Sequence, residues 1–127
     1  MRVRILVVDD SPSMRTVIRA VLEDDGYEVA ASEDGEEALA SFQATTPDLV
    51  ITDIYMSRMD GLTLVRGIRA LPACRFLPIL VLTTEAGEEM KQRGRAAGAT
   101  GWIVKPFEPD QLREVVGRLL RLRGARA

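Results

Sequence analysis

Several polar side chains directly follow apolar, strand-like runs, and they are of the types that phosphoryl transfer uses. They are the carboxylates of Asp9, Asp10 and Asp53, the hydroxyls of Thr83 and Thr84, and the amine of Lys105. Three carboxylates in one cleft repel one another, so a cation is needed to offset them, and all-oxygen ligands with open positions suit Mg²⁺. A lysine and a hydroxyl beside them would bind an oxyanion, and a carboxylate that attacks phosphorus becomes an acyl phosphate.

The composition excludes several other chemistries. The 127 residues include no histidine and one cysteine, Cys74, so Ser-His and Cys-His nucleophiles, an internal disulfide and a structural zinc site are not expected. The net charge of -2, from 17 basic and 19 acidic residues, gives no sign of nucleic-acid binding. The N-terminal residues resemble neither a signal peptide nor a membrane span, and we expect a cytoplasmic protein without a membrane partner.

Five apolar runs alternate with segments of helical spacing. Strands are predicted at 3–8, 27–31, 49–52, 78–82 and 102–104, and helices are predicted to begin near Pro12, Gly35, Leu62, Gly87 and Pro109. The first and last helices each have five apolar residues at helical spacing to bury: Met14, Val17, Ile18, Val21 and Leu22 in the first, and Leu112, Val115, Val116, Leu119 and Leu120 in the last. The fourth helix has only Met90, Ala96 and Ala97 to bury. Such alternation requires parallel strands with helices on both faces, so the strand ends are expected to converge on Asp53.

At these residues the chain resembles a receiver domain of bacterial two-component response regulators, most closely the stand-alone chemotaxis (CheY-like) type. The resemblance is carried by Asp9-Asp10, Asp53-Ile54-Tyr55-Met56 with Asp60-Gly61, Thr83, and Lys105-Pro106-Phe107, and it extends over essentially the whole chain. It implies an α/β, doubly wound, flavodoxin-like (βα)5 fold with strand order 2-1-3-4-5. We expect residues 1–127 to form a single receiver domain.

The resemblance also implies a role for each site residue. Asp53 would be the phosphoacceptor, and Mg²⁺ would be held by Asp10, Asp53 and the backbone carbonyl of Tyr55, with Asp9 acting through a water. Lys105 would contact the phosphoryl oxygen and precede a cis bond to Pro106.

Four residues are implied to transmit or tune the signal. Thr83 would swing toward the phosphoryl group, and Trp102 stands at the position of the aromatic switch residue. Tyr55 and Glu85 stand at the variable positions that tune dephosphorylation in the family.

Two residues depart from the usual family pattern. Ser57 stands where proline usually follows the methionine, so the loop after Asp53 is expected to be less rigid. Trp102 replaces the more usual Tyr or Phe, and its indole is larger.

The resemblance implies that a sensor histidine kinase supplies the phosphoryl group from a phosphohistidine. The phosphorylated chain, expected to be a monomer, would change its affinity for a downstream protein such as a flagellar motor switch component. The last two helices and the strand between them would form the changed face, and the polar helix from Gly87 is expected to be the mobile element. Because no effector domain follows, the output would be a protein–protein interaction.

Other interpretations remain open from the sequence. A receiver in a phosphorelay or a kinase-control circuit would share every motif, and a small Mg²⁺-dependent phosphohydrolase would share the acidic cleft. A flavin-binding module has the same fold, but Asp9-Asp10-Ser11-Pro12 would repel phosphate unless a metal intervened.

Taken singly, the site residues could also serve structural roles in turns and helix caps, and Trp102 could be an aromatic residue that covers the rim of the core. Three glycines are not interpreted as a dinucleotide-binding fingerprint, because they precede a strand and do not follow one: Gly94, Gly98 and Gly101. Four arginines are interpreted as favourable charge at a helix C-terminus and not as a nucleic-acid site: Arg118, Arg121, Arg123 and Arg126.

Overall fold

A computed structural model of the chain describes the backbone of residues 2–126 and the side chains of residues 2–122. Five parallel strands form one sheet in the order β2-β1-β3-β4-β5, which confirms the predicted order. Their bounds are β1 Arg4–Val8, β2 Glu28–Ser32, β3 Leu49–Thr52, β4 Ile79–Thr83 and β5 Gly101–Val104. Each predicted strand is present. Each of its ends lies either at the predicted residue or one residue away from it.

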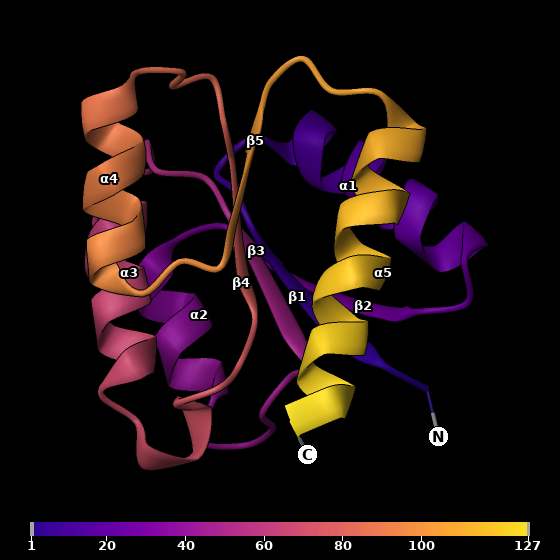
Figure 1. The fold of residues 1–127 in the computed structure, drawn as a ribbon, viewed down its shortest axis with the longest axis horizontal. Helices are drawn as coiled ribbons and strands as arrows, with labels where there is room; N and C mark the ends of the chain where they lie inside the picture. Colours follow the sequence, from indigo (N-terminus) through magenta and orange to yellow (C-terminus); the bar gives the residue numbers. More distant parts are fainter. Residues whose placement is uncertain (1, 127) are drawn as a thin grey trace.

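The helices cover both faces of the sheet. Helices α1 (Pro12–Asp24) and α5 (Pro109–Arg126) lie on one face, and α2 (Gly35–Ser41), α3 (Gly61–Arg69) and α4 (Glu88–Ala97) lie on the other (Figure 1). A short 3-10 turn, Pro72–Cys74, follows α3. Among the described residues, no helix is both long enough and apolar enough to cross a membrane.

The core has two sides because side chains alternate along each strand. In β1, Ile5 and Val7 pack with α1 and α5, whereas Leu6 and Val8 pack with α2 and α3. All four residues of β3 and all five of β4 are buried, since helices cover both of their faces. Continuous burial explains why the central strands appear in the sequence as uninterrupted apolar runs.

Side-chain caps confirm three of the predicted helix starts, those of α1, α2 and α3. Ser11 Oγ accepts a hydrogen bond from the Met14 amide at 3.2 Å, with Pro12 at the first helical position. Asp34 and Asp60 cap α2 and α3 in the same way. Each cap satisfies an amide that has no partner within its helix.

Two apolar residues predicted to be buried are exposed. Val17 is 48% exposed, because α1 packs on the sheet through Ile18, Val21 and Leu22 instead. Ala96 is exposed as well, and the only fully buried residue of α4 is Gly94. Met90 and Ala97 are partly buried. Helix α4 is therefore attached to the sheet by even less apolar surface than its sequence indicates.

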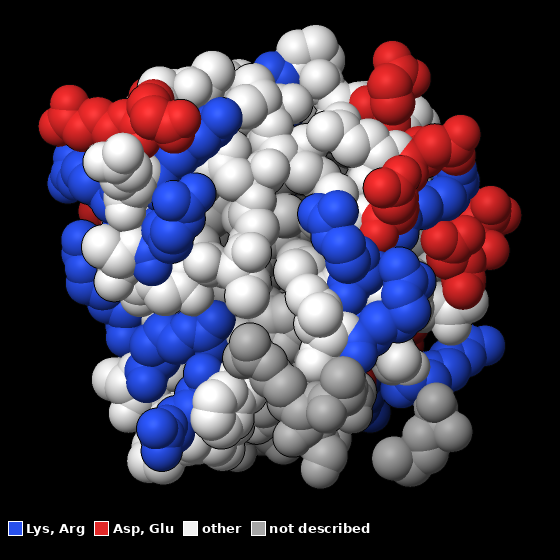
Figure 2. Space-filling model, viewed as in Figure 1, with Lys and Arg blue, Asp and Glu red and all other residues white. Residues whose placement is uncertain are grey.

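Basic side chains gather over α4 and α5. Figure 2 shows Lys and Arg over both helices, on either side of an uncharged band that follows β5. Between α4 and β5, the residues Lys91, Arg95, Thr100 and Trp102 line a hollow of about 90 Å³. Arg118 and Arg121 are exposed on α5, whereas the side chains of Arg123 and Arg126 lie outside the described residues.

Candidate functional site

The carboxyl ends of four strands bring the predicted site residues to one edge of the sheet. Asp9 follows β1, Asp53 follows β3, Thr83 ends β4 and Lys105 follows β5. The register pairs Val8 with Thr52 and Thr83 with Val104, so the residues after these pairs emerge from neighbouring strands at one level. This edge is where doubly wound sheets bind their ligands.

Lys105 joins two of the carboxylates. Its Nζ donates to Asp53 Oδ2 at 2.8 Å and to Asp9 Oδ2 at 2.9 Å, and both aspartates are buried, with 9% and 2% of their surface exposed. The predicted cis bond to Pro106 is present. Burial alone lowers the pKa of Lys105, but the hydrogen bonds to Asp53 and Asp9 outweigh burial and raise this pKa above its ordinary value.

The raised pKa of Lys105 predicts a loss of stability at alkaline pH. The folded chain holds the ammonium proton more tightly than the unfolded chain, whose lysine pKa is near 10.5. The contribution of the ion pairs is thus complete below that pH and declines as pH rises through the higher folded pKa. We expect the difference in unfolding free energy between wild type and Lys105→Met, measured by urea denaturation, to shrink as the pH rises from about 10.5 to 12. A difference that is constant over this range would contradict the prediction.

The carboxylate of Asp53 is held in one orientation. Its Oδ1 accepts the amide hydrogens of Ile54 at 2.6 Å and Tyr55 at 3.2 Å, while Oδ2 receives Lys105. Gly61 lies against this turn, and a Cβ at position 61 would come within 2.0 Å of the Asp53 carbonyl oxygen. Only glycine therefore allows α3 to begin so close to the end of β3.

Asp10 differs from the other two acids. It is exposed, and among residues 2–122 its carboxylate has no hydrogen bond or ion pair. Asp9, in contrast, accepts the Ser11 amide on Oδ1 at 2.9 Å and Lys105 on Oδ2. The possible metal ligands at this edge are oxygens, and one carboxylate has no protein partner among the described side chains, a set that fits a hard cation such as Mg²⁺.

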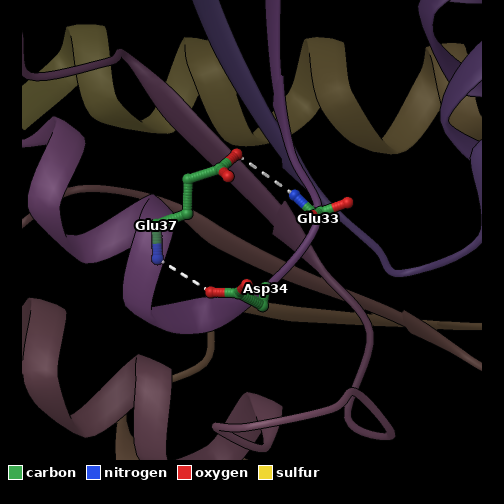
Figure 3. Close-up of side chains that lie close together, drawn as sticks. All are labelled: Glu33, Asp34 and Glu37. Carbon is green, nitrogen blue, oxygen red and sulfur yellow. Dashed lines mark hydrogen bonds between the residues drawn. The ribbon is translucent and has the colours of Figure 1, made fainter.

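A second group of acids serves the local fold at the start of α2. Within the described side chains, Glu33, Asp34 and Glu37 are the one acidic trio whose oxygens all lie within 4.8 Å of one another. Asp34 Oδ1 accepts the Glu37 amide at 2.8 Å, and Glu37 reaches back to the Glu33 amide at 3.4 Å (Figure 3). These reciprocal bonds cap α2. Within the described side chains, the acids of the strand edge form no such trio, because Asp9 and Asp53 share Lys105 whereas Asp10 faces solvent.

Glu85 connects the site to α4. Its carboxylate accepts the Tyr55 hydroxyl at 2.5 Å and the Gly87 amide at 3.0 Å, and its carbonyl accepts the Trp102 indole N–H at 3.0 Å. Its amide donates to Oγ1 of the buried Thr83 at 3.3 Å. The hydrogen bond to Tyr55 lowers the pKa of Glu85, and the same bond raises the pKa of Tyr55. One loop residue thus contacts Thr83, Tyr55 and Trp102 together.

Trp102 is a residue of β5, and its half-buried side chain packs against α4. A Cβ added at Gly94 would lie 2.5 Å from Trp102 Cζ3, so the ring rests directly on the helix backbone. We predicted no packing role for Gly94. The available signal was glycine inside a helix, which is unfavourable by about 1 kcal/mol relative to alanine and therefore suggests a close approach.

Gly94→Ala is expected to displace the Trp102 ring and to destabilise the protein by about 1 to 3 kcal/mol. The gain in helix propensity, about 1 kcal/mol, is smaller than the cost of the overlap. Chemical denaturation and tryptophan fluorescence measure both effects, since Trp102 is the chain's one tryptophan. Gly117→Ala in α5 is the matched control, because its Cβ would meet only the flexible end of Arg121 at 3.3 Å. A stabilised Gly94→Ala with unchanged emission would contradict the prediction.

Comparison with known proteins agrees with this geometry. A solved structure of the Vibrio cholerae chemotaxis protein CheY4 is 44% identical, with a TM-score of 0.90, and the match covers 94% of this chain and 99% of that one. The family model of the response regulator receiver domain matches residues 5–117. The chain belongs to the response regulator receiver domain family. Such receiver domains are signalling switches of two-component systems, as the resemblance implied.

Two further relatives of this receiver domain bear on its function. The gliding motility regulatory protein of Myxococcus xanthus is 40% identical over 104 residues, which are 82% of this chain and 13% of that protein. The receiver domain of the sensor histidine kinase PA1611 from Pseudomonas aeruginosa PAO1 is 32% identical, with a TM-score of 0.87, and the match covers 94% and 98% of the two chains. That structure has a magnesium ion coordinated in its active-site cleft.

The loop that carries Ser57 has an unusual backbone in this receiver domain. Arg58, the next residue, has φ of 70°, in the left-handed region that non-glycine residues seldom adopt. Its guanidinium lies 3.8 Å from Asp34 and 3.9 Å from Glu36, so ion pairs attach the loop to the start of α2. The expected lower rigidity of this loop stays a prediction.

Proposed function

We propose that Asp53 accepts a phosphoryl group from the phosphohistidine of a partner kinase. The observation that carries the proposal is the contact of one partly buried lysine, Lys105, with both Asp53 and Asp9 at the sheet edge. A structural ion pair needs one acid, whereas this lysine has two, beside a third carboxylate, that of Asp10, which has no protein partner within residues 2–122. An ammonium placed there would contact an oxygen of a phosphoryl group attached to Asp53 Oδ2.

Mg²⁺ fits the same donor set, and Asp10, Asp53 and the Tyr55 carbonyl would hold it, with Asp9 acting through a water. When bound, the ion neutralises phosphoryl oxygens and helps align the donor. The coordinated magnesium of the PA1611 receiver domain supports this assignment.

In the proposed transfer, Asp53 Oδ2 forms a bond to phosphorus as the bond from phosphorus to the donor's imidazole nitrogen breaks, and that nitrogen keeps the electron pair. The chain's own groups orient the nucleophile. The amides of Ile54 and Tyr55 hold Oδ1, which leaves Oδ2 as the attacking atom. Lys105 would leave its direct bond with Oδ2 and contact the transferred group.

The phosphorylated state would be transmitted through Thr83 and Glu85. Oγ1 of Thr83 accepts a bond from the Glu85 amide and keeps its own hydrogen, which it would donate to a phosphoryl oxygen. Movement of Thr83 would disturb Glu85 and hence its bonds to Tyr55 and Trp102. Helix α4 is weakly anchored and would be the element that shifts, with Trp102 as the switch aromatic. Tyr55 and Glu85 would tune the loss of phosphate by covering the site.

The output would be a changed affinity of the face formed by α4, β5 and α5 for a downstream protein. A chemotaxis or motility pathway is supported by the similarity to CheY4 and to the Myxococcus regulator, and a flagellar motor switch component is the partner we propose. We propose further that residues 1–127 act as one monomeric receiver unit in the cytoplasm. Comparing partners for selective binding of the phosphorylated form would separate motor output from a phosphorelay.

The proposal is tested with acetyl phosphate as a small-molecule donor. We expect intact-mass analysis to find one added phosphoryl group, sensitive to hydroxylamine as an acyl phosphate, that maps to Asp53 and requires Mg²⁺. Chelation with EDTA is the control. Label on a serine or threonine, or labelling that continues in EDTA, would refute the proposed mechanism.

A further inference from the structure

Two arginines on α1 make the same kind of contact to different parts of the fold. Arg15 Nη1 donates to the backbone carbonyl of Asp9 at 2.6 Å, and Arg19 Nη2 donates to the backbone carbonyl of Val29 at 2.9 Å. The first contact lies at the candidate site and the second at the edge strand β2. Substituting Arg15 therefore tests an effect on the site, whereas substituting Arg19 tests only the packing of α1 on the sheet.

The bond from Arg15 completes the fixation of Asp9. The Asp9 amide donates to the Ser32 carbonyl at 3.2 Å, and its two carboxylate oxygens accept the Ser11 amide and Lys105. With Arg15 on the carbonyl, every polar atom of Asp9 has a partner. Asp10, the next residue, has none for its carboxylate within residues 2–122.

A fixed carbonyl on Asp9 orients Asp10 because the peptide unit is planar. The Asp9 carbonyl lies in one rigid plane with the amide and Cα of Asp10. Holding the carbonyl oxygen from the Arg15 side stops that plane from rotating and thereby sets where the side chain of Asp10 begins. Without the bond, the exposed carboxylate would sample more directions and would lose more entropy on binding a cation.

We propose that Arg15 is a positioning residue for the cation site, acting through the Asp9–Asp10 peptide to keep the Asp10 carboxylate directed for Mg²⁺. The inference rests on the proposed function, which assigns Asp10 to the ion. Arg15 itself touches neither the ion nor the phosphoryl group.

Charge and positioning predict opposite results for the loss of Arg15. A guanidinium on the Asp9 carbonyl, next to the candidate cation site, repels a divalent cation, so charge alone predicts that Arg15→Met binds Mg²⁺ more tightly. Positioning predicts weaker binding, since outer partners of metal ligands contribute a roughly tenfold or larger change in metal affinity. The sign of the effect therefore separates the two explanations.

Isothermal titration calorimetry with MgCl₂ on the full chain tests the proposal. We expect Arg15→Met to raise the dissociation constant roughly tenfold. Arg15→Lys, which retains the charge and one donor, is expected to recover part of the loss. Arg19→Met is the matched control and is expected to bind Mg²⁺ as the wild type does. Phosphorylation of Arg15→Met by acetyl phosphate is expected to need more Mg²⁺ but to reach the wild-type rate at saturation.

Three results would overturn the inference. Arg15→Met could bind Mg²⁺ as well as or better than wild type, Arg19→Met could weaken binding equally, or the rate of Arg15→Met could stay low at saturating Mg²⁺. Urea denaturation of each variant shows that the folded protein is being titrated. A wild type that binds no Mg²⁺ would refute the proposed function, whereas a binding wild type with an unchanged Arg15→Met would refute this inference alone.

Discussion

Replacing Asp53 with asparagine is expected to abolish phosphoryl incorporation from acetyl phosphate and the Trp102 fluorescence change on addition of beryllofluoride with Mg²⁺. The amide has nearly the shape of the carboxylate, so its oxygen still accepts the Ile54 and Tyr55 amides. It lacks the anionic oxygen that would attack phosphorus, and a neutral amide is a poor nucleophile. Intact-mass analysis and steady-state fluorescence measure the two losses.

Asp110→Asn is the control for this prediction, because Asp110 is an exposed carboxylate on α5 whose one ion-pair partner among the described side chains is Arg113. It is expected to be labelled like the wild type. Label that persists in Asp53→Asn would transfer the acceptor role to another residue, and a fluorescence response that persists would mean that Trp102 reports on something other than Asp53.

Lys105→Met is expected to slow phosphorylation by about a hundredfold or more, the usual effect of removing one donor to a developing oxyanion. The same change leaves Asp9 and Asp53 buried without their cation, since both contact Lys105 Nζ. We expect a loss of about 3 kcal/mol in unfolding free energy from the uncompensated charge. Rates measured at saturating Mg²⁺ and urea denaturation at neutral pH give the two values.

A double substitution separates the two effects of Lys105. Adding Asp53→Asn to Lys105→Met removes one of the unpaired charges and is expected to restore part of the stability, but none of the phosphorylation. Arg66→Met, at an exposed cation of α3, is the control and is expected to change neither rate nor stability appreciably. Wild-type rates in Lys105→Met would contradict the role proposed for the ammonium.

The amino-acid sequence predicted the five strands and the residues that meet at the sheet edge, and the resemblance to receiver domains implied the strand order. Continuous apolar runs such as 49–52 and 78–82 indicated strands buried on both faces, and Ser11-Pro12 marked the start of a helix. Parallel strands bring their carboxyl ends to one edge of the sheet, and this does not depend on which apolar side chains form the core. For this reason the sequence alone predicts that Asp9, Asp53, Thr83 and Lys105 lie at one edge of the sheet.

The tertiary structure decided which atoms meet. Val17 and Ala96 fit a helical pattern but face solvent, because packing of a helix on a sheet depends on the helix's rotation and not only on its spacing. Gly94 against Trp102 and Arg15 on the Asp9 carbonyl join residues from different elements, and no local pattern encodes such a contact. Periodicity along a chain specifies which residues share one side of an element, and only the packed fold specifies where that side faces and what its side chains touch.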